Sequence, residues 1–153
     1  MFHWHLETLM AYAHQQKLQA ASIVSCVGSL RKASLRLADA THDARDKELH
    51  FDEKLEITSL VGTLGLEGGH LHMSVANKEG CVFGGHVLPG CQIFTTAEII
   101  LVHLQDLTFS RRHDPATGFG ELVVQRNWPR VGHGVVSGLL LSVLAYLILR
   151  KPS

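Results

Sequence analysis

The chain has 153 residues, which is enough for one domain with a sizeable buried core. Its 14 Lys and Arg residues balance its 14 Asp and Glu residues, so the formal net charge is zero. The composition therefore excludes a strongly basic nucleic-acid-binding domain, although it leaves room for a local basic patch.

Up to residue 126 the sequence predicts one helix and many strands. Apolar residues recur at helical spacing in residues 3–16 and predict an amphipathic helix. Segments that alternate or are rich in β-branched residues predict strands, with turn residues between them, at 20–30, 32–39, 54–65, 69–77, 81–88, 91–113 (as one strand or two) and 121–125. Strands do not alternate with helices, so the pattern predicts an α+β domain with a mainly antiparallel sheet and a flanking N-terminal helix.

The end of the chain has a different character. Pro129 interrupts residues 127–130, which we interpret as a linker after a domain of residues 1–126. Residues 131–150 then form an apolar run that carries no charged residue before Arg150. A helix of this length spans roughly the 30 Å hydrocarbon core of a bilayer. We therefore predict a C-terminal hydrophobic helix that anchors a cytosol-facing domain in an intracellular membrane. A helix buried in the domain or in an oligomer interface is the alternative, for a soluble nuclear or cytoplasmic protein.

The stretch GGHLHMSVANKEGCVFGGH, residues 68–86, predicts a β-hairpin with a polar turn. The turn ends in a glycine, which suits the left-handed position of a three-residue loop with a bulge. With residues 78–80 as the loop, Asn77 faces Cys81 across the hairpin. A loop of two or four residues, or a bulge at the glycine pair 84–85, would change which side chains share a face.

The three-residue loop brings three histidines to one face of the hairpin. His72 then lies opposite His86, and His70 lies two residues along on the same face, because side chains alternate along a strand. Directly opposed residues have Cβ atoms roughly 5 Å apart, so the three imidazoles converge. Three histidines with an open fourth position are a ligand set of catalytic zinc sites. The spacing predicts a metal site, and three unrelated histidines on a half-buried sheet remain the alternative.

Three motifs give the chain a resemblance to a known family: CVGSL (26–30), GGHLHMS…GGH (68–86) and TTAEI (95–99). Together they make residues 6–124 resemble the PPC domain (plants and prokaryotes conserved), of the single-domain, histidine-containing type. The resemblance implies a sheet-based α+β fold that assembles as a homotrimer, and a distant structural kinship with acetolactate decarboxylase-like zinc proteins. It also implies that a metal ion, zinc, is held by the three histidines of the hairpin: His70, His72 and His86.

Polar residues near such a site are candidates for acid–base or supporting roles. Arg36, Glu56 and Glu98 are the candidate catalytic residues, because each is a polar residue within an apolar strand. A salt bridge or an interface contact is the alternative for each of them. The chain also departs from the family pattern, which usually opens with a β-strand before the first helix. We therefore expect an edge strand to be missing, and the hydrophobic tail is no part of the pattern.

Two classes of function remain open. The first is a small trimeric protein that binds or transforms a small carbonyl or carboxylate ligand at a three-histidine zinc site. The second is a non-enzymatic platform for DNA or protein partners, since plant members join the domain to AT-hooks. An AT-hook needs an Arg-Gly-Arg core to enter the minor groove, and this sequence contains none. Direct DNA binding is therefore the weaker hypothesis.

Overall fold

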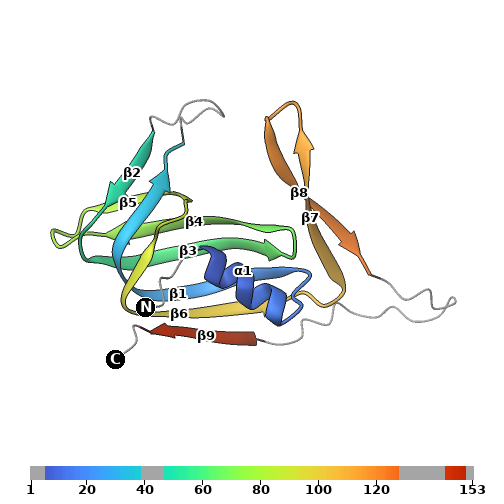
Figure 1. Ribbon diagram of the computed structural model, residues 1–153, viewed down its shortest axis with the longest axis horizontal. Helices are drawn as coiled ribbons and strands as arrows, with labels where there is room; N and C mark the ends of the chain where they lie inside the picture. The colour runs from blue at the N-terminus through green and yellow to red at the C-terminus, as the bar shows by residue number, and fades with distance from the viewer. Residues whose placement is uncertain (1–5, 39–46, 128–143, 151–153) are drawn as a thin grey trace, which may run out of the picture.

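A computed structural model of the protein describes residues 6–38, 47–127 and 144–150. In these residues one short helix, α1 (Leu6–Gln15), precedes nine strands (Figure 1). The strands are β1 (Ala21–Arg36), β2 (Glu48–Phe51), β3 (Leu55–Gly65), β4 (Gly68–Ala76), β5 (Val82–Val87), β6 (Gln92–His103), β7 (Leu107–Asp114), β8 (Phe119–Arg126) and β9 (Leu144–Arg150). The prediction of a mainly antiparallel sheet with one N-terminal helix is confirmed.

The main sheet has seven strands and is organised around β1. Its order is β3-β4-β5-β1-β6-β9, with β2 also paired to β1, and every pairing is antiparallel. In addition, residues 21–30 of β1 pair directly with β3. The far end of β1 pairs with β5, so the β3-β4-β5 meander starts and ends beside the same strand. The sequence predicts two separate strands, 20–30 and 32–39, whereas the structure has the single strand β1 from Ala21 to Arg36.

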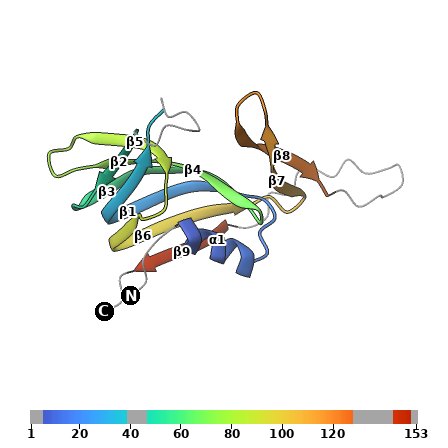
Figure 2. The same ribbon diagram turned by 45° about the horizontal axis from the view of Figure 1, so that its top comes forward.

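The hydrophobic core lies between α1 and one face of this curved sheet (Figure 2). Leu9 and Ala13 of α1 are fully buried. On β4, alternate residues face the core: Leu71, Met73 and Val75 are buried, whereas the histidines between and before them are exposed. Because a one-residue slip would expose these apolar side chains, the core determines which face of β4 carries the histidines.

β7 and β8 form a separate two-stranded sheet that projects away from the main sheet (Figure 1). Several hydrogen bonds attach the base of this hairpin to the rest of the chain. The Phe109 N–H donates to the Gln19 carbonyl at 2.9 Å, and the Arg111 N–H donates to the Glu67 carboxylate at 3.1 Å. The Arg111 guanidinium also donates to Thr63 Oγ1 at 2.9 Å. These bonds fix the hairpin beside the ends of β3 and β4.

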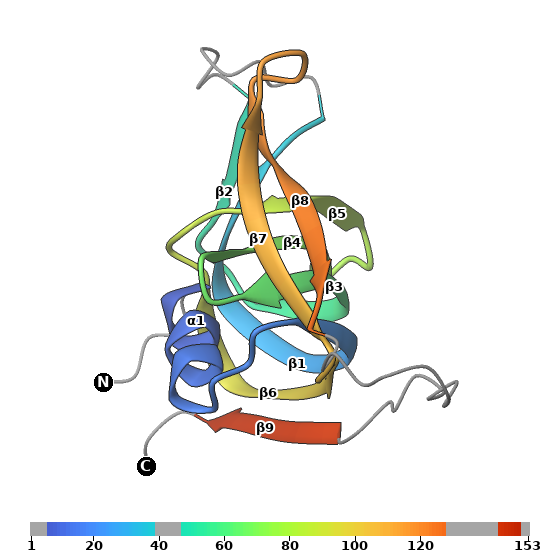
Figure 3. The same ribbon diagram turned by 90° about the vertical axis from the view of Figure 1, so that its right-hand side faces the viewer.

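The predicted C-terminal helix over residues 131–150 is wrong for its last part. Leu144–Arg150 form β9, antiparallel to β6 at the edge of the sheet (Figure 3). An apolar run of this kind suits a strand as well as a helix, and the edge of β6 offers its unpaired backbone groups as partners. Residues 131–143, the rest of that prediction, lie outside the described residues. Within the described part of the chain, no helix is long and apolar enough to cross a membrane.

We expect deletion of residues 144–153 to expose the backbone of β6. Seven residues of β6, from Thr96 to Val102, face β9 in the present pairing. Without β9 their outward amides lose their partners, and hydrogen exchange in β6 should rise by on the order of tenfold or more. Exchange measured by mass spectrometry checks this, with β4 peptides of the same protein as the internal control. Unchanged exchange in β6 would contradict the pairing.

Gly28 in the CVGSL motif makes a close backbone contact with β6. Its φ is +149°, and a Cβ at this position would meet the Thr96 carbonyl oxygen and lie 2.7 Å from the Ala97 Cα. We expect Gly28→Ala to lower the free energy of unfolding by on the order of 3 kcal/mol, measured by urea denaturation. In the control Gly120→Ala, the new Cβ would lie 3.6 Å from the Arg111 Cβ, an ordinary contact. Similar losses in both variants would show that Gly28 has no special role.

Candidate metal centre

The β4–β5 hairpin has the predicted three-residue loop. The Asn77 N–H donates to the Cys81 carbonyl at 3.0 Å, and the Gly80 N–H donates to the Asn77 carbonyl at 2.9 Å. The Asn77 side-chain oxygen accepts the backbone N–H groups of Glu79 at 3.1 Å and Cys81 at 2.9 Å. Gly80 has a φ of +80°, in the left-handed region that glycine adopts without strain. The side chain of Asn77 and the backbone of Gly80 therefore set the loop length.

The register that follows from this loop is as predicted. Pairing runs without a bulge from Ala76 opposite Val82 to His72 opposite His86. The glycine pair 84–85 stays in register, so it does not move His86 to the other face. A Cβ at Gly85 would collide with the backbone carbonyl of Arg36, which shows how closely the end of β1 approaches this strand.

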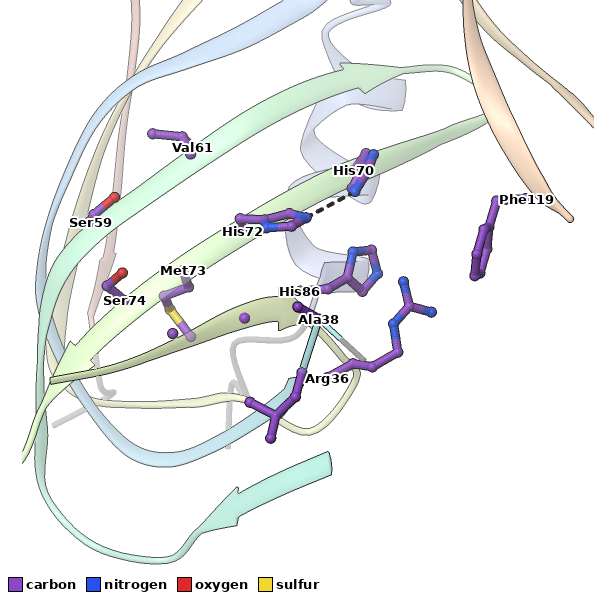
Figure 4. A pocket seen from close by; sticks show the side chains of 13 residues that line it. Arg36, Ala38, Ser59, Val61, His70, His72, Met73, Ser74, His86 and Phe119 are labelled. Atoms are coloured by element: carbon purple, nitrogen blue, oxygen red, sulfur yellow. Dashed lines mark hydrogen bonds between the residues drawn. The ribbon is translucent and has the colours of Figure 1, made fainter. Parts of the chain in front are cut away.

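His70, His72 and His86 lie together at the surface of the sheet (Figure 4). The Nε2 atoms of His70 and His72 are 3.1 Å apart. The ring centre of His70 is 5.0 Å from those of the other two, which are 5.5 Å from each other. One nitrogen from each ring lies within 4.8 Å of the others. Two nitrogens bound to a tetrahedral zinc ion at about 2.0–2.1 Å are about 3.3 Å apart. The Nε2 atoms of His70 and His72 therefore already have nearly the spacing of two zinc ligands.

The surroundings favour the neutral form of two of these imidazoles. Burial, followed by the positive charge of Arg36, lowers the pKa of His86 to about 4. Burial and then the neighbouring imidazole of His72 lower the pKa of His70, with smaller contributions from two arginines and an opposing one from Glu121. Both rings are therefore neutral at pH 7 and have a nitrogen lone pair, as a metal ligand requires.

One nitrogen of the cluster lacks a partner within the described chain. The Nδ1 atom of His86 is buried and makes no hydrogen bond to any described residue. Such a group costs free energy unless something satisfies it, and buried polar atoms without partners are rare. The chemistry of three imidazoles, one of them with an unsatisfied buried nitrogen, fits a metal ion.

The histidines face a pocket of about 560 Å³ (Figure 4). This volume is in the range of small-molecule sites, about 300–1,000 Å³. Besides the histidines, its walls come from the end of β1, from β3, β4 and β5, and from the separate β7–β8 hairpin; the lining includes Arg36, Ala38, Ser59, Val61, Ser74 and Phe119. No Asp or Glu is among its lining residues in the described part of the chain.

Of the three candidate catalytic residues, the structure places Arg36 in the pocket lining and Glu56 and Glu98 outside it. Arg36 lines the pocket because the end of β1 pairs with β5, which places Arg36 opposite His86. Its Cζ lies over the Phe119 ring, 5.2 Å from the ring centre. Glu56 is exposed on β3 and Glu98 is half-buried on β6, and neither lines the pocket.

Several wall residues are absent from the sequence prediction. Ser59 and Ser74 face each other across β3 and β4, on the same side as the histidines. Ser74 follows His70 by four residues, so strand alternation alone places it on that face. Phe119 carries no such signal, because its hairpin reaches the pocket only through tertiary contacts.

Comparison with known proteins decides the family. The sequence profile of the Plants and Prokaryotes Conserved (PCC) domain matches residues 5–105, more than half of the chain. The chain belongs to this family. The matched range contains all three histidines, Arg36 and most of the main sheet. The resemblance to the PPC domain seen in the three sequence motifs is thereby confirmed.

Individual relatives extend this result. The chain is 48% identical over 120 residues to "Bifunctional protein GlmU" of Synechococcus sp. (strain JA-3-3Ab), a match that covers 78% of this chain and 18% of that protein. The PPC-domain chain thus spans less than a fifth of that relative's length.

Two solved structures share the fold. A hypothetical protein from Salmonella cholerae-suis is 35% identical with a TM-score of 0.74, over 82% of this chain and 88% of that one. A metal-containing protein from Archaeoglobus fulgidus is 24% identical with a TM-score of 0.66, over 80% of this chain and 88% of that one.

Proposed function

We propose that this PPC-domain protein binds a zinc ion through His70, His72 and His86 and uses it to bind or transform a small molecule. The observation that carries the proposal is the convergence of the three imidazoles at the surface of one pocket, with one nitrogen from each within 4.8 Å of the others. The Archaeoglobus protein of the same fold is a metal-containing protein, which agrees with a metal here.

The donor set favours zinc and leaves room for a ligand. Imidazole nitrogens suit zinc, and a site with three protein ligands keeps a fourth position open. When bound, the ion would act as a Lewis acid that polarises an oxygen of the small molecule. The chain's own residues hold the imidazoles in place through the hairpin register, and they shape the pocket with Val61 and Phe119.

We also propose that the protein is a homotrimer, as the family resemblance implies. Three large apolar side chains on the neighbouring strands β1 and β3 support an interface: Val24, Val27 and Val61 are 58%, 55% and 50% exposed. Val61 lies opposite His72, so this apolar surface adjoins the pocket. Burying it between copies would remove apolar area from water, which is the common reason for such exposed patches.

Metal analysis of the whole chain tests the zinc site. After loading and dialysis, the unaltered protein should retain about one zinc ion per chain, and His72→Ala less than about a third of an ion, because two imidazoles hold zinc far more weakly than three. His113→Ala is the matched control, since His113 is exposed on β7 and does not line the pocket. It should retain as much zinc as the unaltered protein.

Two outcomes would contradict the proposal. The first is zinc retention that His72→Ala leaves unchanged, or no retention by any variant. The second is an electrophoretic shift of an AT-rich duplex at physiological salt that is equal for the unaltered protein and His72→Ala, which would favour the platform for DNA.

A further inference from the structure

The positive charges of two arginines, Arg36 and Arg111, act on the histidine cluster. The two guanidinium groups differ in their hydrogen-bond partners. Arg111 donates hydrogen bonds to Thr63 Oγ1 at 2.9 Å and to the Gly120 carbonyl at 3.5 Å. Arg36 lines the pocket, and no described side chain accepts a hydrogen bond from its guanidinium or forms an ion pair with it. Its donors thus have no acceptor among the described residues and can serve a molecule in the pocket.

Phe119 holds the Arg36 side chain in this position. The guanidinium carbon lies over the ring, 5.2 Å from its centre, as Figure 4 shows from the pocket side. The negative face of an aromatic ring attracts the positive charge of a guanidinium, which stabilises this position of the side chain. A planar fork of donors that is already oriented loses little entropy when it binds an oxyanion.

The charge of the described pocket lining favours a negatively charged ligand. Three neutral imidazoles with a divalent ion would carry two positive charges, and Arg36 adds a third. No acidic side chain in the described residues lines the pocket. Among the described residues, the negative charge of Glu121 acts on His70, and its carboxylate accepts a hydrogen bond from the Thr117 hydroxyl at 2.8 Å. An anionic ligand would compensate this charge.

We propose that Arg36 forms an anion subsite that binds the carboxylate of a small ligand. A carbonyl or hydroxyl oxygen on the adjacent carbon of the same ligand would then bind the metal. The proposal rests on the zinc site proposed above and adds the ligand class: small carboxylic acids with a carbonyl or hydroxyl oxygen on the adjacent carbon. A guanidinium fork matches both carboxylate and phosphate. The apolar wall of Ala38, Val61 and Phe119 favours an acid that carries carbon substituents over an inorganic ion.

Cobalt(II) in place of zinc gives the test an optical readout, because its visible spectrum changes when a ligand enters the open position. The cobalt-loaded chain is titrated with pyruvate and lactate, and with methyl pyruvate as an uncharged probe of similar shape. In the unaltered protein the acids should bind at least about tenfold more tightly than the ester, the effect of one charge-assisted pair. In Arg36→Gln this preference should fall by about tenfold while cobalt content stays the same.

The chain offers a matched control for the lost charge. Arg112→Gln removes an exposed arginine from the β7–β8 hairpin, next to Arg111 and outside the pocket lining. This variant should keep the full preference for the acids over the ester. Arg36→Lys keeps the charge without the fork, and Phe119→Leu keeps Arg36 without the ring that orients it. Both should bind the acids with intermediate affinity, which keeps the proposal testable if Arg36→Gln does not fold.

Each contrary outcome has a separate meaning. An unchanged preference in Arg36→Gln overturns the subsite and leaves the metal site standing. Competition by inorganic phosphate at concentrations as low as those of pyruvate overturns the assignment to carboxylates. Failure of the unaltered protein to hold cobalt or zinc overturns the metal site, and the subsite with it.

Discussion

The turn between β4 and β5 determines where every histidine of the cluster lies. Its length is set by the Asn77 side chain, which accepts two backbone N–H groups, and by the left-handed conformation of Gly80. One residue more or less would move His86 to the opposite face of the sheet. The buried side chains of β4 oppose the same slip, because it would bring Leu71 and Met73 into water. Local turn chemistry and the core thus stabilise the same register.

The second constraint is the length of β1, which connects the core to the pocket. Its first part pairs with β3 and β6 in the middle of the sheet, and its last residues pair with β5. That last pairing places Arg36 opposite His86, and Gly85 allows the close approach because it lacks a side chain. The positive charge beside the histidines therefore results from backbone pairing and does not depend on a flexible loop.

The features that the sequence predicts well are those that depend on neighbouring residues. The hairpin register follows from a turn and from strand alternation, so His72 opposite His86 could be predicted from residues 68–86 alone. The strand at the C-terminal segment could not be predicted in this way, because an apolar run fits a helix or a strand. The formation of β9 depends on the edge of β6, which is more than forty residues away in sequence. Phe119 was missed for a related reason, since hydrogen bonds at the base of its hairpin bring it to the pocket.

The pocket is lined by residues of both the main sheet and the β7–β8 sheet, and these two parts can change independently among members of the family. The histidines and Arg36 belong to the part that matches the family, residues 5–105, whereas Phe119 lies beyond it on a hairpin with its own pairing. Changes in that hairpin can alter the wall that a ligand meets without disturbing the strands that hold the imidazoles. Under the proposed function, metal binding and ligand selection are then separable traits, so two relatives with the same three histidines need not recognise the same molecule.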